Sequence, residues 1–280
     1  MHYDNVLITG ASSGIGLHLA HQFASHGHPV VLVARQQPEL DALAAELTGL
    51  YGQPARAIAK DLEKPESAQE LYDELLAEAV DIGILVNNAG HGFRGKSWEL
   101  TIEQDLSMVR LNIEAVLRLT KLFLPGMIAR DHGRILNTAS VAGFEPGPML
   151  NVYHATKAFV LSWSEALAVE LEGTAITVTA LCPGPTDTDF FPKADMVAVR
   201  GVQKASVMAP QDVAKAGYEG LLKGELFVVP GGMNKALAAA RRLLTEHAQA
   251  KLNEKMYEEV PPEDRTRNRG DIEAKAGLPA

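Results

Sequence analysis

The fold of this chain is indicated first by the stretch Val6-Leu7-Ile8-Thr9-Gly10-Ala11-Ser12-Ser13-Gly14-Ile15-Gly16. An apolar run typical of a buried strand leads into a glycine-rich turn, and a helical pattern follows from about Leu17 to His26. Gly10 allows a tight turn, Gly14 permits close backbone approach to a pyrophosphate, and Gly16 lets the helix pack tightly on the strand. Because a helix N-terminus offers amide donors to phosphates, the stretch predicts a dinucleotide site.

The rest of the chain repeats this alternation of apolar β-branched runs with longer amphipathic segments. The predicted strands are 6–8, 30–33, 55–59, 84–86, 135–137, 176–179 and 226–229. Strands that are apolar throughout favour a parallel sheet covered on both faces, since a one-sided sheet would alternate polar and apolar residues. We therefore expect an α/β, doubly wound, parallel seven-stranded sheet.

Composition excludes several classes of protein. With 280 residues and 46% hydrophobic content, the chain can bury one sizeable core. A net charge of −9 disfavours nucleic acid or an anionic membrane surface as the main partner. No apolar run reaches the roughly 20 residues that span a bilayer. The start, Met1-His2-Tyr3-Asp4, lacks a signal pattern, and the single Cys182 fits a reducing compartment as a buried structural thiol. The expected location is cytoplasmic.

The C-terminal part differs in composition from the rest. Residues 234–259 are a charged helical stretch whose leucines and alanines, Leu237 and Ala240 among them, could cover the body or meet a partner. Residues 261–280 are rich in charge, proline and glycine, which predicts a mobile tail or a partner contact. We expect a catalytic domain over residues 1–232, with residues 233–280 as a helical extension and tail of the same domain.

The segment Tyr153-His154-Ala155-Thr156-Lys157 carries the clearest chemical signal. Residues four apart on a helix share one face, so the ammonium of Lys157 can lie beside the phenol of Tyr153. A neighbouring cation favours the phenolate, which predicts a lowered pKa for Tyr153. Such a tyrosine can donate a proton to an alkoxide formed from a carbonyl, or remove one from an alcohol.

The sequence resembles the short-chain dehydrogenase/reductase family, in its compact branch, because several motifs follow one another along the chain in the family's order. The resemblance covers residues 4 to about 230 and rests on the glycine-rich turn Thr9–Gly16, Asn87-Asn88-Ala89-Gly90, Asn112, Ser140, Tyr153, Lys157 and Pro183-Gly184. It implies a Rossmann-like fold, a nicotinamide cofactor, no metal, and a catalytic tetrad of Asn112, Ser140, Tyr153 and Lys157. In that tetrad Ser140 holds the substrate oxygen, Tyr153 exchanges the proton, Lys157 also holds the nicotinamide ribose, and Asn112 holds a relay water. A purely structural Asn112 is the alternative.

The choice of cofactor is predicted from the end of the second strand, Ala34-Arg35. An NAD site usually has a carboxylate there, which bonds the ribose hydroxyls. Here Ala34 removes the carboxylate, and the guanidinium of Arg35 can pair with a 2′-phosphate, so NADP(H) is expected over NAD(H). The alternative is that Arg35 is a solvated loop charge. Asp61-Leu62 resembles the family pair beside adenine, although Asp61 would also suit a helix cap.

The resemblance assigns the remaining cofactor contacts. On the adenosine side it places Asn87 as a direct contact, together with Ala89 and Gly90. The alternative is that these residues form an ordinary turn, since asparagine and glycine are common in turns after a strand. Pro183 to Thr188 follows the sixth strand and resembles the stretch beside the nicotinamide carboxamide. The full predicted cofactor set is Gly10, Ser12, Ser13, Gly14, Ile15, Gly16, Arg35, Asp61, Leu62, Asn87, Ala89, Gly90, Tyr153, Lys157, Pro183, Gly184, Thr186 and Thr188.

The predicted activity is hydride transfer between NADP(H) and a ketone, aldehyde or secondary alcohol. Apolar residues in 189–208 and in 143–149 predict a lid and a wall for a moderately apolar substrate, unless they pack only against each other. A substrate held on an acyl carrier protein ranks lower. Members of the resembled family that bind this acidic carrier use basic residues near this helix layer, and Arg130 has no second positive charge in Glu170–Gly173. His91 is interpreted as a loop histidine. The alternative function is a catalytically silent NADPH-binding sensor or scaffold; a sugar epimerase or dehydratase ranks below it.

The expected assembly is a homodimer or homotetramer. Relatives in the resembled family often pair through the two helices that here carry residues 105–124 and 151–170.

Overall fold

The computed structural model describes residues 4–232, 234–236 and 243–277, and within these ranges seven parallel strands form one sheet in the order β3-β2-β1-β4-β5-β6-β7. This confirms the predicted doubly wound α/β fold. The strands are β1 (Asn5–Thr9), β2 (Val30–Ala34), β3 (Ala55–Ala59), β4 (Ile82–Asn87), β5 (Gly133–Thr138), β6 (Ile176–Leu181) and β7 (Phe227–Val228). The chain order reverses between β1 and β4, so the carboxyl ends of these strands flank the crevice in which such sheets bind ligands.

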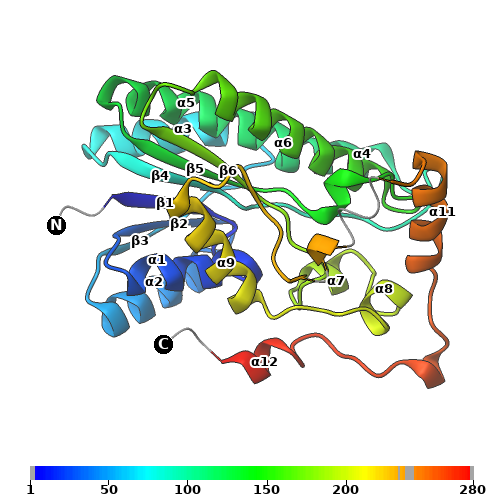
Figure 1. The fold of residues 1–280 in the computed structure, drawn as a ribbon. Coiled ribbons are helices and arrows are strands. Elements are labelled where there is room, and N and C mark those ends of the chain that lie inside the picture. Colours follow the sequence, from blue (N-terminus) through cyan, green and yellow to red (C-terminus); the bar gives the residue numbers. More distant parts are fainter. Residues whose placement is uncertain (1–3, 233, 237–242, 278–280) are drawn as a thin grey trace.

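Helices cover both faces of the sheet (Figure 1). On one face lie α1 (Gly14–Ser25), α2 (Gln37–Tyr51) and α9 (Pro210–Lys223), and on the other lie α3 (Pro65–Ala77), α5 (Ala115–Arg130) and α6 (Asn151–Glu170). Each face has its own apolar core, one around Phe23 and Leu40 and the other around Leu71 and Phe123. Burial of the sheet on both sides is the reason that its strands are apolar throughout.

The helical run predicted from Asp105 to Leu124 is interrupted in a way that spacing did not indicate. It begins as α4 (Ile102–Val109), continues as a π-helical segment η1 (Arg110–Glu114), and ends as α5. Thr101 starts α4 with a capping box, in which its hydroxyl accepts from Gln104 N at 3.3 Å and the Gln104 side chain accepts from Thr101 N at 2.9 Å. A π-helical turn widens the helix at η1.

The C-terminal part folds back over the body rather than extending away from it. Helix α11 (Glu246–Met256), capped by Thr245, lies at the end of the molecule near α4, and the chain then passes below the short helix α8 (Arg200–Gln203) to α12 (Glu273–Ala276) (Figure 1). The described residues of the tail from 261 onwards therefore pack against the body of the molecule. Its backbone and side chains bond to the sheet domain, as described below. Leu237 and Ala240 lie outside the described residues.

Candidate active site

A continuous cavity of about 400 Å³ lies at the carboxyl edge of the sheet. It runs from Arg35 and Asp61 at one end, past the glycine-rich turn, to Ser140 and Tyr153 at the other. Its walls contain most of the predicted site residues: Gly10, Ser12, Ser13, Gly14, Ile15, Arg35, Asp61, Leu62, Ala89, Gly90, Ser140, Tyr153, Lys157, Pro183, Gly184, Thr186 and Thr188. Three predicted residues, Gly16, Asn87 and Asn112, lie behind the walls.

The glycine-rich turn has the backbone that an anion site requires. Gly10 and Gly14 have φ angles of +66° and +55°, which L side chains rarely adopt. A Cβ at Gly14 would also lie 3.0 Å from Thr188 Cγ2, and one at Gly16 would collide with the carbonyl oxygen of Gly10. Ser13, the N-cap of α1, makes no side-chain hydrogen bond to the helix, so the first amides of α1 stay available to a ligand phosphate.

The end of β2 and the loop after β3 shape the far end of the cavity. Ala34 and Arg35 both line it, and no carboxylate occupies the position after β2. Asp61 accepts a hydrogen bond from Glu63 N at 3.2 Å. Since the N-cap of α3 is Lys64, Asp61 stabilises the turn before the helix instead of capping it.

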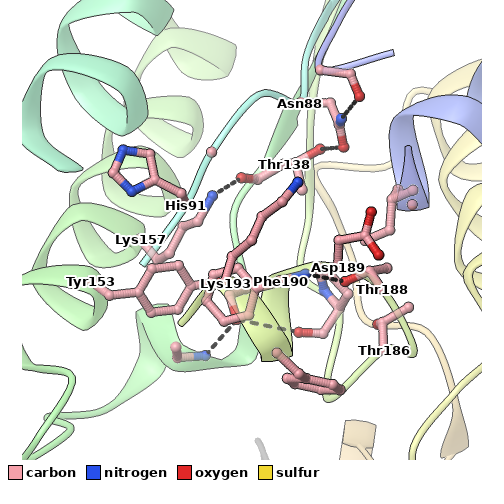
Figure 2. A pocket seen from close by; sticks show the side chains of 18 of the residues that line it. Asn88, His91, Thr138, Tyr153, Lys157, Thr186, Thr188, Asp189, Phe190 and Lys193 are labelled. Atoms are coloured by element: carbon pink, nitrogen blue, oxygen red, sulfur yellow. Dashed lines mark hydrogen bonds between the residues drawn. The ribbon is translucent and has the colours of Figure 1, made fainter. Parts of the chain in front are cut away.

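The side chain of Asn87, which was predicted as a direct cofactor contact, does not line the cavity. Its side chain is buried beneath the cavity, where Nδ2 donates to Thr120 Oγ1 at 3.1 Å and to Asn137 Oδ1 at 2.9 Å. The next residue, Asn88, lines the cavity instead (Figure 2). Its Nδ2 donates to Thr9 O at 3.0 Å. Successive residues of a strand point to opposite sides, so only one of the two asparagines can face the site.

Asn112 lies in the π-helical segment η1 and is almost fully buried. Its Nδ2 donates to His91 O at 2.9 Å and to Thr156 Oγ1 at 3.0 Å, while its Oδ1 accepts from His91 N at 3.1 Å. These bonds tie η1 to the loop after β4 and to α6. Gly90 needs to be small here, because a Cβ would lie 3.1 Å from Asn112 Oδ1 and 3.4 Å from Lys157 Nζ. Asn112 therefore lies beside Lys157, and its structural role is to hold these three segments together.

Tyr153 and Lys157 lie on one face of α6 beside Ser140, as their spacing predicts. Lys157 Nζ lies 5.8 Å from the centre of the Tyr153 ring and donates to Thr138 O at 2.7 Å (Figure 2). Burial raises the pKa of Tyr153 to about 12, and a hydrogen bond with Ser140 opposes this only in part. Burial also lowers the pKa of Lys157 to about 8.

The expected lowering of the tyrosine pKa by Lys157 is therefore wrong for this structure. The ammonium of Lys157 is directed to a main-chain carbonyl, and desolvation of the phenol outweighs its charge. Tyr153 is consequently a neutral phenol at ordinary pH, the form that donates a proton.

His91 does more than the predicted loop histidine. It lines the cavity, and its Nε2 lies 2.9 Å from Ser107 Oγ and 3.4 Å from Glu63 Oε1. Burial lowers the pKa of His91, while Glu63 raises it in part. The cluster links α4 to the loop before α3 on the outer side of the cavity. The sequence around His91 gave no signal for these partners, which come from a helix and from a separate loop.

Cys182 is the buried thiol that its apolar neighbours predicted. It has no exposed surface, and burial raises the pKa of its thiol to about 12. A thiol of this kind is a poor nucleophile at ordinary pH.

Residues of the lid predicted between 189 and 208 line the cavity beside Tyr153. Its short helix α7 (Phe190–Lys193) brings the Phe190 ring to 5.0 Å from the Tyr153 ring, between centroids (Figure 2). Several lid residues also pack among themselves in an apolar cluster that includes Leu150, Phe191 and Met196. Both alternatives for the apolar loop residues are thus realised, since these three residues pack in the cluster and also line the cavity.

The profile of the family described as short chain dehydrogenase matches residues 4–196. The chain belongs to the short-chain dehydrogenase/reductase family. It is 32% identical over 269 residues to a very-long-chain 3-oxoacyl-CoA reductase of Pyrenophora tritici-repentis (strain Pt-1C-BFP), covering 91% of this chain and 76% of the relative. It is 36% identical over 217 residues to the NADP-dependent 3-hydroxy acid dehydrogenase YdfG of Escherichia coli (strain K12), covering 75% of this chain and 86% of that one.

A solved short-chain dehydrogenase from Sphingobium yanoikuyae in complex with NADPH superposes with a TM-score of 0.77 at 37% identity, covering 85% of this chain and 94% of that structure. These matches confirm the family and the Rossmann-like fold. This short-chain dehydrogenase/reductase is an oxidoreductase that acts on the CH–OH/C=O pair with a nicotinamide cofactor. Over the part of the chain that the structure describes, no helix combines the length and apolar character needed to cross a membrane.

Proposed function

We propose that this chain is an NADPH-preferring carbonyl reductase, which transfers a hydride between nicotinamide and a moderately apolar ketone, aldehyde or secondary alcohol. The observation that carries the proposal is one continuous cavity, which has the glycine-rich turn and Arg35 at one end and Ser140, Tyr153 and Lys157 at the other. A ligand long enough to contact both ends would lie with one terminus beside the Tyr153 phenol.

The residues around Tyr153 divide the proposed chemistry between them. The nicotinamide ring supplies or accepts the hydride when the cofactor is bound. Ser140 donates a hydrogen bond to the substrate oxygen and stabilises charge as it develops there. Tyr153 passes its phenolic proton to that oxygen, and Lys157 holds ribose hydroxyls of the cofactor in this proposal. Asn112, bonded to the His91 main chain, fixes the helix behind Lys157.

Preference for NADPH is argued from the end of β2. Arg35 lines the cavity where a 2′-phosphate would lie, and Ala34 brings no carboxylate that would repel it. The solved relative that is in complex with NADPH and the relative named as NADP-dependent support the same preference.

Exchange of Arg35 for aspartate is expected to weaken NADPH binding at least about tenfold more than NADH binding. A charge-assisted hydrogen bond contributes about 1.5–3 kcal/mol, and the new carboxylate also repels the phosphate. Fluorescence titration of both cofactors measures the effect. Arg118→Asp, a matched change at an exposed guanidinium on α5, should alter neither affinity. Equal losses for the two cofactors in Arg35→Asp would refute the assignment.

The substrate class is inferred from the walls of the cavity near Tyr153. Phe144, Leu150, Phe190 and Met196 make this end apolar. The relatives named for 3-oxoacyl and 3-hydroxy acid chemistry support a carbonyl or hydroxyl carbon as the reacting group.

A panel of ketones and aldehydes, each assayed for NADPH and NADH oxidation, tests the proposal. We expect NADPH consumption with at least some apolar carbonyls and weaker consumption of NADH. Tight NADPH binding with no turnover of any carbonyl or alcohol would instead favour the catalytically silent sensor. That alternative has no specific structural observation in its favour, because Ser140, Tyr153 and Lys157 all reach the same cavity.

We also propose that residues 233–280 belong to the same domain as residues 1–232, and that the chain forms a homodimer. The described tail residues bond to the sheet domain at Asp187 and Asp189, which supports one domain. Exposed apolar side chains on α4 and α6, among them Ile102 and Phe159, support pairing through these helices.

A further inference from the structure

The described C-terminal residues place one helix against the substrate end of the cavity. Asn253 and Met256 of α11, with Tyr257 at its end, line the same cavity as Ser140 and Tyr153. Figure 1 shows α11 at the end of the molecule that is remote from α1 and α2. These two helices neighbour the strands whose ends carry the predicted adenosine site. Helix α11 therefore contributes to the substrate part of the cavity and not to its adenosine part.

Tyr257 is fixed by the residue next to the predicted proton donor. His154 Nδ1 lies 2.8 Å from Glu145 O, and its Nε2 lies 2.7 Å from the Tyr257 hydroxyl. A carbonyl can only accept, so Nδ1 carries the ring proton and Nε2 accepts from the Tyr257 hydroxyl. The burial that lowers the pKa of His154 to about 4 keeps this neutral form at ordinary pH. Gly147 makes room for the contact, since a Cβ there would overlap the His154 ring.

The rest of α11 is held to the walls on both sides of the cavity. Asn253 is buried, and its Nδ2 donates to Pro146 O at 2.9 Å on the wall that precedes α6. On the lid side, Arg200 N donates to Glu258 O at 2.9 Å and Val260 N donates to Ala198 O at 2.8 Å. These bonds fasten the extension to the lid as well as to the wall.

Arg94 joins the same elements from the loop after β4. Its side chain is only 9% exposed, and its Nη2 lies 2.6 Å from Glu259 Oε1. Its Nε donates to Asp195 O at 2.8 Å, and its Nη1 donates to Tyr257 O at 3.4 Å. One guanidinium thus positions the lid and the extension relative to each other, which makes Arg94 a positioning residue for the end of the cavity.

We propose that α11 and Tyr257 form the end wall of the substrate chamber, and that this wall limits the length of the carbonyl substrate. The inference rests on the proposed function, because a carbonyl bound at Tyr153 must extend its remaining atoms toward the wall, the lid or the entrance. A short or compact ketone fits in front of the fixed Tyr257 ring. A long unbranched chain directed at this ring meets a side chain that His154 and Arg94 prevent from moving aside.

A series of methyl ketones of increasing chain length tests the proposal. For the wild-type enzyme, kcat/KM should fall at least about tenfold once the chain reaches the wall, since one badly accommodated methylene costs about that much. Tyr257→Ala should move this limit to longer ketones, chiefly through KM, with the dissociation constant of NADPH unchanged. Tyr257→Phe keeps the ring but removes the hydroxyl that His154 holds, so it should move the limit less than Tyr257→Ala does.

Two further variants make the result decisive. Leu252→Ala alters an exposed side chain on the same helix and should change neither the limit nor NADPH binding. Met256→Ala removes side-chain volume from the wall at a second position. It provides the same test if Tyr257→Ala does not fold. A wild-type enzyme inactive with every ketone would contradict the proposed function. Normal activity with an unchanged length limit in both Tyr257→Ala and Met256→Ala would overturn the end wall alone.

Discussion

Tyr153→Phe is expected to lower kcat at least about a thousandfold while NADPH still binds with nearly wild-type affinity. The phenol is the proposed proton donor, and positioned acid–base groups contribute about 10²–10⁴-fold to rate. With the pKa of Tyr153 raised to about 12, the hydroxyl keeps its proton at neutral pH and no other group in the proposal replaces it. The phenylalanine ring preserves the packing against Phe190.

Two measurements separate loss of chemistry from loss of binding. Steady-state NADPH oxidation with an active ketone gives kcat, and fluorescence titration gives the dissociation constant of NADPH. Tyr72→Phe removes a hydroxyl from a ring that packs on Phe123 in the outer helix layer, and it should leave both values unchanged. Retention of a tenth or more of wild-type turnover in Tyr153→Phe would show that another group moves the proton.

Local spacing was sufficient to predict the part of the site that lies within one turn or one helix. The positions of Gly10, Gly14 and Gly16 follow from the strand-turn-helix pattern, and Tyr153 and Lys157 share a face because they are four residues apart. The direction of the Asn87 side chain also had a signal in the sequence. Asn87 is the last residue of β4, and the alternation of a strand directs it away from the face that Asn88 reaches.

Contacts that join distant segments had no signal in the sequence. Arg94 appears as a loop charge until the fold brings Asp195 and Glu259 to it, 101 and 165 residues further along the chain. The pKa of Tyr153 was predicted in the wrong direction for a related reason. The charge of Lys157 follows from spacing, whereas the extent of burial and the bond to Thr138 O follow only from the packed structure.

Asp187 is a buried acidic residue that bonds to residues of the C-terminal tail. Its side chain is 5% exposed, and Arg269 Nη1 lies 3.7 Å from its Oδ1. Its carboxylate accepts from Gly270 N at 2.9 Å, Ile272 N at 2.8 Å and Glu273 N at 3.1 Å. Burial alone would raise the pKa of Asp187, but these bonds and Arg269 together lower it, so the group is ionised at neutral pH. The tail is therefore bound to the segment between Thr186 and Thr188, the two proposed carboxamide contacts.

Asp187→Ala is expected to detach the tail. Breaking such a buried cluster costs about 3 kcal/mol or more, because three amides and one guanidinium lose their shared acceptor. That corresponds to a roughly hundredfold increase in the population with an open tail, and limited trypsin digestion measures it as faster cleavage after Arg267 and Arg269.

Asp264→Ala, at an exposed position of the same tail, should leave the cleavage rate unchanged, and Asp187→Asn should be intermediate because one acceptor oxygen remains. Equal cleavage of Asp187→Ala and the wild type would mean that other contacts, such as Arg269 with Asp189, hold the tail. A detached tail should also weaken NADPH binding, since the carboxylate that fixes the tail lies between Thr186 and Thr188. If cleavage increases while NADPH affinity stays constant, the tail is attached to the cofactor segment without helping to shape it.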